Sequence, residues 1–328
     1  MRLQSLLTLV NGTLLNKPAI TSFENVSFSA SKVKRGDLYI SVSGNFFDEA
    51  LHNGAYIVLF DSDIDVTDEE VAWVKVVSLN DALIKLIRYK MSKKNIKAFK
   101  IDKKTASLLN SFSTDNRLFY LNDSIDKNAE YLYKLDSNSI VLSTNSNYLK
   151  KLFAQIHTVK KGMTPLQIIS SGVFSISFIY KNVYYDRIKL SSFFTLSLQA
   201  LVTLFEENQI SFSLNQLGSS FCCQVQFIDR FLNQREFGKS EQALIFEKNI
   251  SLAKELFIYF KKNAPWANVI GVFPKRIKLL NSLNYDKIDE ISKILLNEHY
   301  EYAIIAGENK SLLEHNSFNL KPKQPSLL

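Results

Sequence analysis

Short apolar runs alternate with segments of helical spacing along most of this chain of 328 residues. Residues 38–42 and 56–60 have the composition of strands, and residues 81–90 carry apolar side chains at the spacing of a helix. The same alternation returns near the C-terminus in five further segments, 242–246, 251–262, 268–273, 287–298 and 302–307. Strands that alternate with helices in this way form parallel sheets covered by helices. The sequence therefore predicts an α/β fold, with a parallel Rossmann-like sheet in the C-terminal part.

Changes in this pattern divide the chain into three expected domains. The polar run Lys90–Lys97 ends a small α/β domain that comprises residues 1–95. Residues 96–217 form a second unit, and residues 218–319 form the C-terminal Rossmann-like domain. The last segment, 320–328, has two prolines and no periodicity, so we expect it to be a disordered tail.

The net charge of +8 is compatible with nucleic-acid binding. The positive residues, however, are mostly lysines scattered as pairs along the chain. Arginine, which reads bases and phosphates with two parallel hydrogen bonds, is scarce. A solvated lysine surface explains the charge better, and a lysine-rich nucleic-acid-binding protein stays an alternative. Salt-sensitive retention on DNA would identify it.

Two further features concern the compartment of the protein. Its two cysteines, Cys222 and Cys223, are adjacent, and neighbouring residues of a strand point to opposite faces. This arrangement excludes a disulfide framework and argues against a zinc site. No apolar run is long enough to span a membrane. The N-terminal apolar stretch is interrupted by Asn11-Gly12 and lacks a small-residue cleavage site. We therefore expect a cytoplasmic protein whose short N-terminal helix ends at Gly12.

The most specific motif is the stretch Ser29-Ala-Ser-Lys-Val-Lys-Arg-Gly-Asp-Leu-Tyr-Ile-Ser-Val-Ser-Gly44, which closes on Asn53-Gly-Ala-Tyr-Ile-Val-Leu-Phe60. It indicates a tight turn, a short apolar strand, a polar segment and a glycine turn into a second apolar strand. This order resembles the N-terminal domain of the Mur ligases, the ATP-dependent amide-bond ligases that build the bacterial peptidoglycan precursor. There the segment runs Asp-Ser-Arg, a valine, Pro-Gly-Asp-Leu-Phe, a glycine, Asp-Gly-His and Gly-Ala before a strand.

The resemblance implies an ATP site in residues 96–217, which would be a shortened central P-loop-like α/β domain. In the family, the loop Thr-Gly-(Thr/Ser)-x-Gly-Lys-Thr cradles the phosphates. The matching segment is Phe99–Thr105, where Lys104-Thr105 stands in place of the Lys-Thr pair. Both glycines are absent, and Asp102 would place a negative charge against the nucleotide. Together with Arg230, which stands where the family has a nucleotide-contacting Gly-Arg, these residues form a degenerate cofactor site of Lys104, Thr105 and Arg230.

At other positions, too, this sequence lacks the functional residue types of the family. The Asp-Ser-Arg segment aligns with Ser29-Ala30-Ser31, and Asp-Gly-His becomes Phe47-Asp48-Glu49. His52 lies nearby, but a lone histidine on a helix is more often a surface residue than a ligand. The family's Asp-x-Tyr-Asn-Ala-Asn-Pro stretch becomes Phe246-Glu-Lys-Asn-Ile-Ser251, without its aspartate and proline.

These losses predict a Mur-ligase-like protein, a pseudoenzyme linked to peptidoglycan precursor synthesis, that has no ligase activity and no catalytic residues. It would need no cofactor and no metal, and would act by binding an active cell-wall ligase or a peptidoglycan precursor. The first alternative is an active ATP-dependent precursor ligase that uses ATP and Mg through an atypical loop. The lysine-rich nucleic-acid binder is the second alternative.

Overall fold

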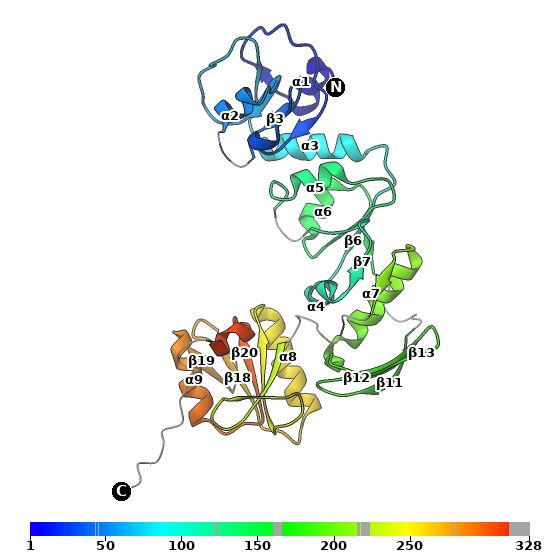
Figure 1. Cartoon of the computed structure of the whole chain (residues 1–328), viewed down its shortest axis with the longest axis vertical. Coiled ribbons are helices and arrows are strands. Elements are labelled where there is room, and N and C mark those ends of the chain that lie inside the picture. The colour runs from blue at the N-terminus through cyan, green and yellow to red at the C-terminus, as the bar shows by residue number, and fades with distance from the viewer. Residues whose placement is uncertain are drawn as a thin grey trace. The chain divides into compact units, whose positions relative to one another are not determined.

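The structure is a computed structural model that describes residues 1–42, 44, 46–121, 124–159, 166–214, 217, 224–277, 279 and 281–314. These residues form helices and five sheets, several of them parallel, so the predicted α/β class is confirmed (Figure 1). Within the described ranges no helix is long and apolar enough to cross a membrane. The adjacent cysteines Cys222 and Cys223 and the predicted tail 320–328 lie outside the described residues.

Contacts group the chain into two compact units. The first comprises Met1–Ile101 and Asn116–Thr158, and the second comprises Asp102–Asp115 and the chain from Val159 on. The predicted division into residues 1–95, 96–217 and 218–319 does not coincide with these units. The segment 102–115 joins elements that come much later in the sequence, which no local pattern could indicate.

The first unit begins with a five-stranded sheet in the order β1-β5-β4-β3-β2. Its strands are β1 (Thr13–Leu14), β2 (Val26–Ser27), β3 (Leu38–Ile40), β4 (Ile57–Phe60) and β5 (Ala72–Lys75), and all but β1 run parallel. One face packs against α1 (Leu3–Val10) and α3 (Leu79–Met91), the other against α2 (Phe47–His52) and the 3₁₀ helix η1 (Ala30–Lys32). The expected strands at 38–42 and 56–60, the helix at 81–90 and the short N-terminal helix are confirmed.

The two glycine turns of the most specific motif lie against each other. The Gly36 amide donates to the Gly54 carbonyl at 3.1 Å, and the Tyr56 amide donates to the Asp37 carbonyl at 2.9 Å. The Asp37 carboxylate also accepts the amide hydrogen of Lys34 at 2.9 Å, which closes the first turn. The motif therefore sets the register of β3 against β4, and this role requires no ligand.

A second parallel sheet completes the first unit in the order β10-β6-β9-β8. Its strands are β6 (Lys97–Lys100), β8 (Leu118–Tyr120), β9 (Ile140–Ser143) and β10 (His157–Thr158). One face shares a hydrophobic core with α3 and with α5 (Ala129–Lys134) and α6 (Ser146–Leu152). The predicted boundary at Lys90–Lys97 lies inside this unit, because one core joins the residues on both sides of it.

The second unit opens with elements from two parts of the chain. They are α4 (Lys103–Leu108), η2 (Leu109–Ser111), β7 (Ser113–Thr114), β11 (Leu166–Ser171), β12 (Ile176–Tyr180), β13 (Val183–Ile188), η3 (Ser192–Phe194), α7 (Thr195–Glu207) and β14 (Phe212–Ser213). Strands β11, β12 and β13 form an antiparallel sheet, and β7 pairs with β14. Lys181 and Asn182 join β12 to β13 with φ angles of 47° and 63°, the left-handed pair that a two-residue hairpin turn needs.

The C-terminal sheet has the order β16-β15-β17-β20-β18-β19. Its strands are β15 (Gln224–Ile228), β16 (Gln234–Arg235), β17 (Gln242–Glu247), β18 (Val269–Pro274), β19 (Ser282–Tyr285) and β20 (Tyr302–Ala306). Strands β17, β20, β18 and β19 are parallel, but β15 and β16 are antiparallel to their neighbours. The expected parallel sheet is therefore mixed. Short connections join β15 to β16 and β16 to β17, and a parallel crossover needs a longer connection.

The helices of this sheet lie on its two faces. Figure 1 shows α8 (Ile250–Asn263) and α9 (Ile288–Asn297) on opposite sides of the strands. Phe257 of α8 contacts Phe273 of β18 with ring centroids 6.1 Å apart. On the other face, Ile291 of α9 shares a core with Phe246 and with Leu312 of the 3₁₀ helix η5 (Lys310–Glu314). Helix α9 and η5 therefore cover the face opposite α8.

An aromatic cluster joins the antiparallel sheet of β11, β12 and β13 to the C-terminal sheet and its helix α8. Phe174, in the turn between β11 and β12, contacts Phe227, Phe260 and Tyr302 with centroid distances of 5.5, 5.5 and 4.9 Å. Aromatic pairs in this range add to the stabilisation that burial alone provides. The two sheets are thus held together within the second unit.

Candidate functional site

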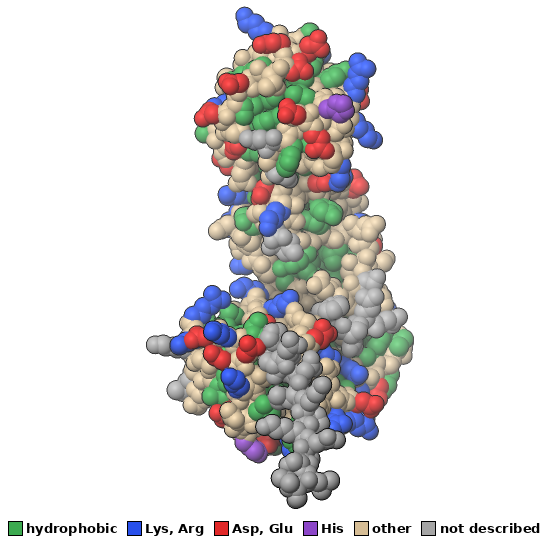
Figure 2. Space-filling view, turned by 60° about the vertical axis from the view of Figure 1, so that its left-hand side comes forward, with side chains coloured by type: hydrophobic (Ala, Val, Ile, Leu, Met, Phe, Trp, Pro, Cys, Tyr) green, Lys and Arg blue, Asp and Glu red, His purple; other side chains and the backbone are tan. Residues whose placement is uncertain are grey.

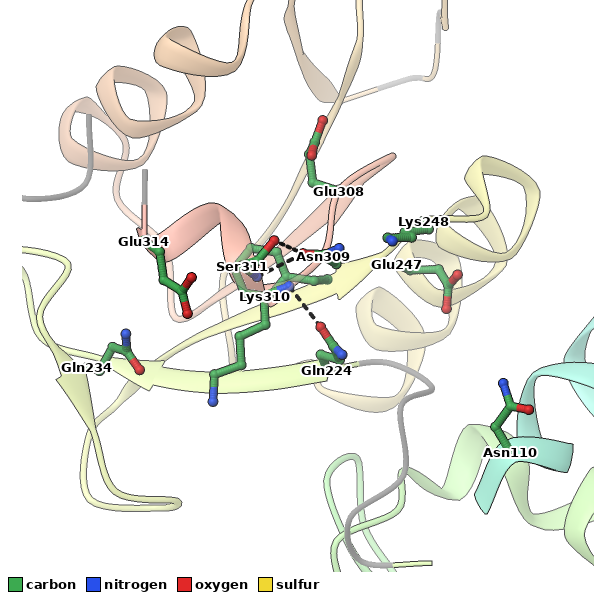
Figure 3. Close-up of a pocket in the computed structure, with 11 residues that line it drawn as sticks. Asn110, Gln224, Gln234, Glu247, Lys248, Glu308, Asn309, Lys310, Ser311 and Glu314 are labelled. Carbon is green, nitrogen blue, oxygen red and sulfur yellow. Dashed lines mark hydrogen bonds between the residues drawn. The ribbon is translucent and has the colours of Figure 1, made fainter. Parts of the chain in front are cut away.

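A polar pocket of about 680 Å³ lies in the second unit, at the carboxyl ends of β17 and β20 (Figure 3). This volume is in the range that small-molecule sites occupy. Figure 3 shows Glu247 and Lys248 at the end of β17, and Glu308, Asn309 and Lys310 after β20. The remaining lining residues are Asn110, Gln224, Gln234, Phe246, Ser311 and Glu314.

The topology of the sheet explains the place of this pocket. From β17 the chain passes to α8 on one face, whereas from the neighbouring β20 it passes to η5 on the other face. Two adjacent parallel strands whose connections leave toward opposite faces create a crevice at their carboxyl ends, and ligands of open α/β sheets bind there. The pocket is therefore the candidate functional site.

The lining carries both signs of charge. Glu247, Glu308 and Glu314 contribute carboxylates, and Lys248 and Lys310 contribute ammonium groups. Such a lining fits a small ligand that itself carries an ammonium and a carboxylate group.

Local hydrogen bonds shape the walls of the pocket. The Glu247 side chain accepts the Asn249 amide hydrogen at 2.8 Å, and the Asn249 side chain in turn caps the first turn of α8. The Gln224 side chain accepts the amide hydrogen of Lys310 at 2.8 Å, which ties β15 to η5. Hydrogen bonds from backbone amides to lining side chains therefore hold the walls of the pocket in place.

The segment predicted to bind ATP runs from β6 into α4, and its polar groups bond within the protein. The Asp102 carboxylate accepts the amide hydrogen of Thr105 at 2.7 Å and caps α4. Thr105 is 3% exposed, and its hydroxyl lies 3.2 Å from that of Ser197 on α7. The Lys104 ammonium group lies 3.5 Å from the ring centroid of Phe193, a cation–π contact. Cofactor binding by Lys104 and Thr105 stays a prediction.

Arg230 lies elsewhere in the second unit. It sits on the exposed turn after β15, with its guanidinium carbon 4.6 Å from the ring centroid of Phe231. Ile228 pairs with Gln242, the first residue of β17, so Arg230 lies beyond the amino end of that strand. The pocket is at the opposite, carboxyl end. The structure thus does not bring Arg230 to the pocket, and its assignment as a nucleotide ligand also stays a prediction.

The remaining positions of interest lie in the first unit. The hydroxyls of Ser29 and Ser31 are 2.9 Å apart, and the side-chain amide of Asn53 donates to the Ala30 carbonyl at 3.0 Å. His52 ends α2 and is exposed, as the sequence predicts for a surface histidine. Across the described ranges, no group of three or more His, Cys, Asp or Glu side chains could hold a metal ion.

Sequence reasoning missed the pocket, although a signal for it exists. Glu247-Lys248 and Gly307-Glu308 each follow a buried apolar run, and polar residues at the carboxyl ends of parallel strands mark ligand crevices. The missing information was that β17 and β20 are neighbours in the sheet. Glu247 pairs with Ala306, which comes 59 residues later in the sequence.

The face of the molecule drawn in Figure 2 carries both basic and acidic side chains. Figure 2 shows Lys and Arg side chains interspersed with Asp and Glu on that face. Nucleic-acid binders commonly concentrate basic side chains on one face or groove. Because the face shown does not separate basic from acidic side chains, the candidate functional site is the polar pocket.

Comparison with known proteins found likenesses to solved structures alone: no family model matches the chain, and no curated protein matches its sequence. A MurF ligase from Thermotoga maritima in complex with ADP is 13% identical, with a TM-score of 0.46, over 88% of this chain and 95% of that one. A MurF from Acinetobacter baumannii is 12% identical, with a TM-score of 0.48, over 94% and 86% of the two chains. At this level the likenesses do not decide what the chain does.

Proposed function

We propose that this chain is a Mur-ligase-like protein that acts in peptidoglycan precursor synthesis by binding and not by ligation. The proposal starts from the motif at residues 29–60, whose order of residues resembles the N-terminal domain of that family. The member that the motif favours is the UDP-N-acetylmuramoyl-tripeptide–D-alanyl-D-alanine ligase. D-alanyl-D-alanine, which that ligase is named for, is a small zwitterionic peptide. The pocket, whose lining carries both signs of charge, supports a ligand of this kind.

One observation supports the proposal that the chain does not ligate. Asp102, Lys104 and Thr105 contact other groups of the protein itself. A phosphate-binding loop presents backbone amides, a lysine and a hydroxyl to the nucleotide. Here the carboxylate of Asp102 accepts the amide hydrogen of Thr105, and the Thr105 hydroxyl is buried against Ser197. Withdrawing a buried hydroxyl from its partner costs about 1–3 kcal/mol before any contact with nucleotide forms. The loop also lacks the glycines that would let its backbone approach a phosphate.

We expect no binding of Mg-ATP at millimolar concentration, because the loop offers a carboxylate and a buried hydroxyl where a nucleotide needs free donors. Isothermal titration calorimetry on the whole chain would measure it. Micromolar affinity that disappears in Lys104→Ala, and that persists in the exposed control Lys262→Ala on α8, would contradict the proposal. That result would favour the alternative of an active ligase with an atypical loop.

We expect D-alanyl-D-alanine, a zwitterionic dipeptide, to bind the pocket, because the lining can pair with both of its charges. Glu308→Gln should weaken this binding about tenfold, since a hydrogen bond to a charged group contributes about 1.5 kcal/mol. The matched control is Glu255→Gln, an exposed position on α8 outside the pocket lining, which should leave the affinity unchanged. Calorimetry that detects no dipeptide binding, or equal losses in both variants, would refute the assignment of this pocket.

A further inference from the structure

Tyr285 reaches from one edge of the parallel strands to the start of the pocket. It is the last residue of β19 and is 6% exposed. Its hydroxyl donates to the carbonyl of Ala306, the last residue of β20, at 2.8 Å. In the sheet β18 lies between β19 and β20, so the side chain of Tyr285 spans the end of a strand to make this bond. Among the standard side chains only tyrosine combines that length with a terminal hydroxyl.

The carbonyl that accepts this bond, that of Ala306, lies two residues before the pocket residue Glu308. Gly307 turns the chain with a φ of +92°, a conformation that residues with a side chain rarely adopt. Its amide donates to the Glu247 carbonyl at 2.9 Å, while the preceding carbonyl accepts from Tyr285. A side chain at Gly307 would come within 3.1 Å of the Tyr285 oxygen, so the contact is close. The turn is thus held from β17 on one side and from β19 on the other.

Tyr285 remains a donor at physiological pH. Burial of the phenol, the negative charge of Glu308 and a hydrogen bond with the Glu308 side chain raise the pKa of Tyr285 to about 12. Arg276 opposes this shift, but its effect on the pKa is smaller. The hydroxyl therefore keeps its proton and can hold the Ala306 carbonyl under all ordinary conditions.

We propose that Tyr285 is the positioning residue of the pocket: its hydroxyl fixes the turn at Gly307 and so holds Glu308 at its place in the pocket lining, where Glu308 would pair with the ammonium group of a zwitterionic ligand. Tyr285 itself does not line the pocket. The inference rests on the proposed function for its ligand, whereas the support of the turn by Tyr285 can be tested without one.

The test compares Tyr285→Phe with Tyr302→Phe. The first variant removes the hydroxyl and leaves the ring in the core, and the second makes the same change at the amino end of β20, outside the pocket lining. D-alanyl-D-alanine should bind Tyr285→Phe about threefold to tenfold more weakly than the unaltered chain, which corresponds to the loss of one hydrogen bond. Tyr302→Phe should bind as the unaltered chain does. Equal affinities in both variants would overturn the inference.

A double-mutant cycle separates positioning from general destabilisation. If Tyr285 acts through Glu308, then Tyr285→Phe should have no further effect on affinity in a Glu308→Gln background. If the two losses add in full, Tyr285 does not act through Glu308, and the proposal is wrong.

Hydrogen exchange tests the support of the turn in the free protein. The amides of Gly307 and Glu308 should exchange about tenfold faster in Tyr285→Phe than in Tyr302→Phe, because local opening is easier once one of its two holding bonds is lost. Unchanged exchange would overturn the inference whatever the ligand. Faster exchange together with no dipeptide binding by the unaltered chain would instead refute the proposed ligand and the role of Glu308 toward it.

Discussion

Replacing Ile304 with alanine should lower the free energy of unfolding by about 2–4 kcal/mol, because it removes buried methyl groups and leaves a cavity. Ile304 is 0% exposed at the centre of β20, where it pairs with Ile245 of β17 and Gly271 of β18. Val58→Ala should cost a similar amount in the first unit, where Val58 is 0% exposed in the middle of β4. Chemical denaturation of the whole chain measures both losses.

The matched controls are charged residues of the predicted nucleotide site. Arg230→Ala changes an exposed turn and should stay within about 0.5 kcal/mol of the unaltered chain. Lys104→Ala should cost about 0.5–1 kcal/mol, since it removes the contact with Phe193 but little buried surface. A loss in either variant as large as that in Ile304→Ala would indicate a buried, partnered site and would reopen the case for a nucleotide pocket.

Replacing Gly54 with alanine should lower the free energy of unfolding by about 3 kcal/mol, through backbone strain and a steric clash together. Gly54 has a φ of +92°, which a residue with a Cβ atom adopts only with strain. The added Cβ would lie 3.0 Å from the Arg35 Cα and 3.3 Å from the Arg35 nitrogen, and these are backbone atoms that cannot move aside alone. Thermal or chemical unfolding of the variant measures the loss.

Gly238→Ala separates the two contributions. Gly238 has a φ of +75°, but no atom lies within 4 Å of the place that its Cβ would occupy. It should therefore cost only about 1–2 kcal/mol, the strain without the clash. Equal losses in the two variants would show that the turns at Arg35 and Gly54 move apart to accept the new atom, and the motif would then not set the register of β3 against β4.

Local chemistry determined the elements that the sequence predicts well. Helix α3 begins where Ser78 supplies an N-cap, with its hydroxyl accepting the Asp81 amide hydrogen at 3.3 Å, and its apolar residues recur at helical spacing. Strands β3 and β4 are uninterrupted apolar runs that begin shortly after the glycine turns at Gly36 and Gly54. The hairpin at Lys181-Asn182 needs only two residues that tolerate left-handed backbone. Each of these signals lies within one short stretch of chain.

Long-range contacts decided the rest. The direction of β15, the inclusion of residues 102–115 in the second unit and the partner of the Thr105 hydroxyl all depend on residues far away in sequence. Lys104 and Thr105 lie in the first turn of α4, and the sequence could not indicate that Phe193 and Ser197 would contact them.

The candidate pocket is the clearest case of this division. By itself the sequence determined that polar residues follow the apolar runs of β17 and β20, because side-chain patterning along a strand is local. Only the tertiary structure decided that these two strands are neighbours, and that the chain leaves them toward opposite faces. It also decided that Tyr285 would reach Ala306 across the end of β18. Strand order and such bridging contacts arise from burial of the whole sheet, a property that no short segment carries.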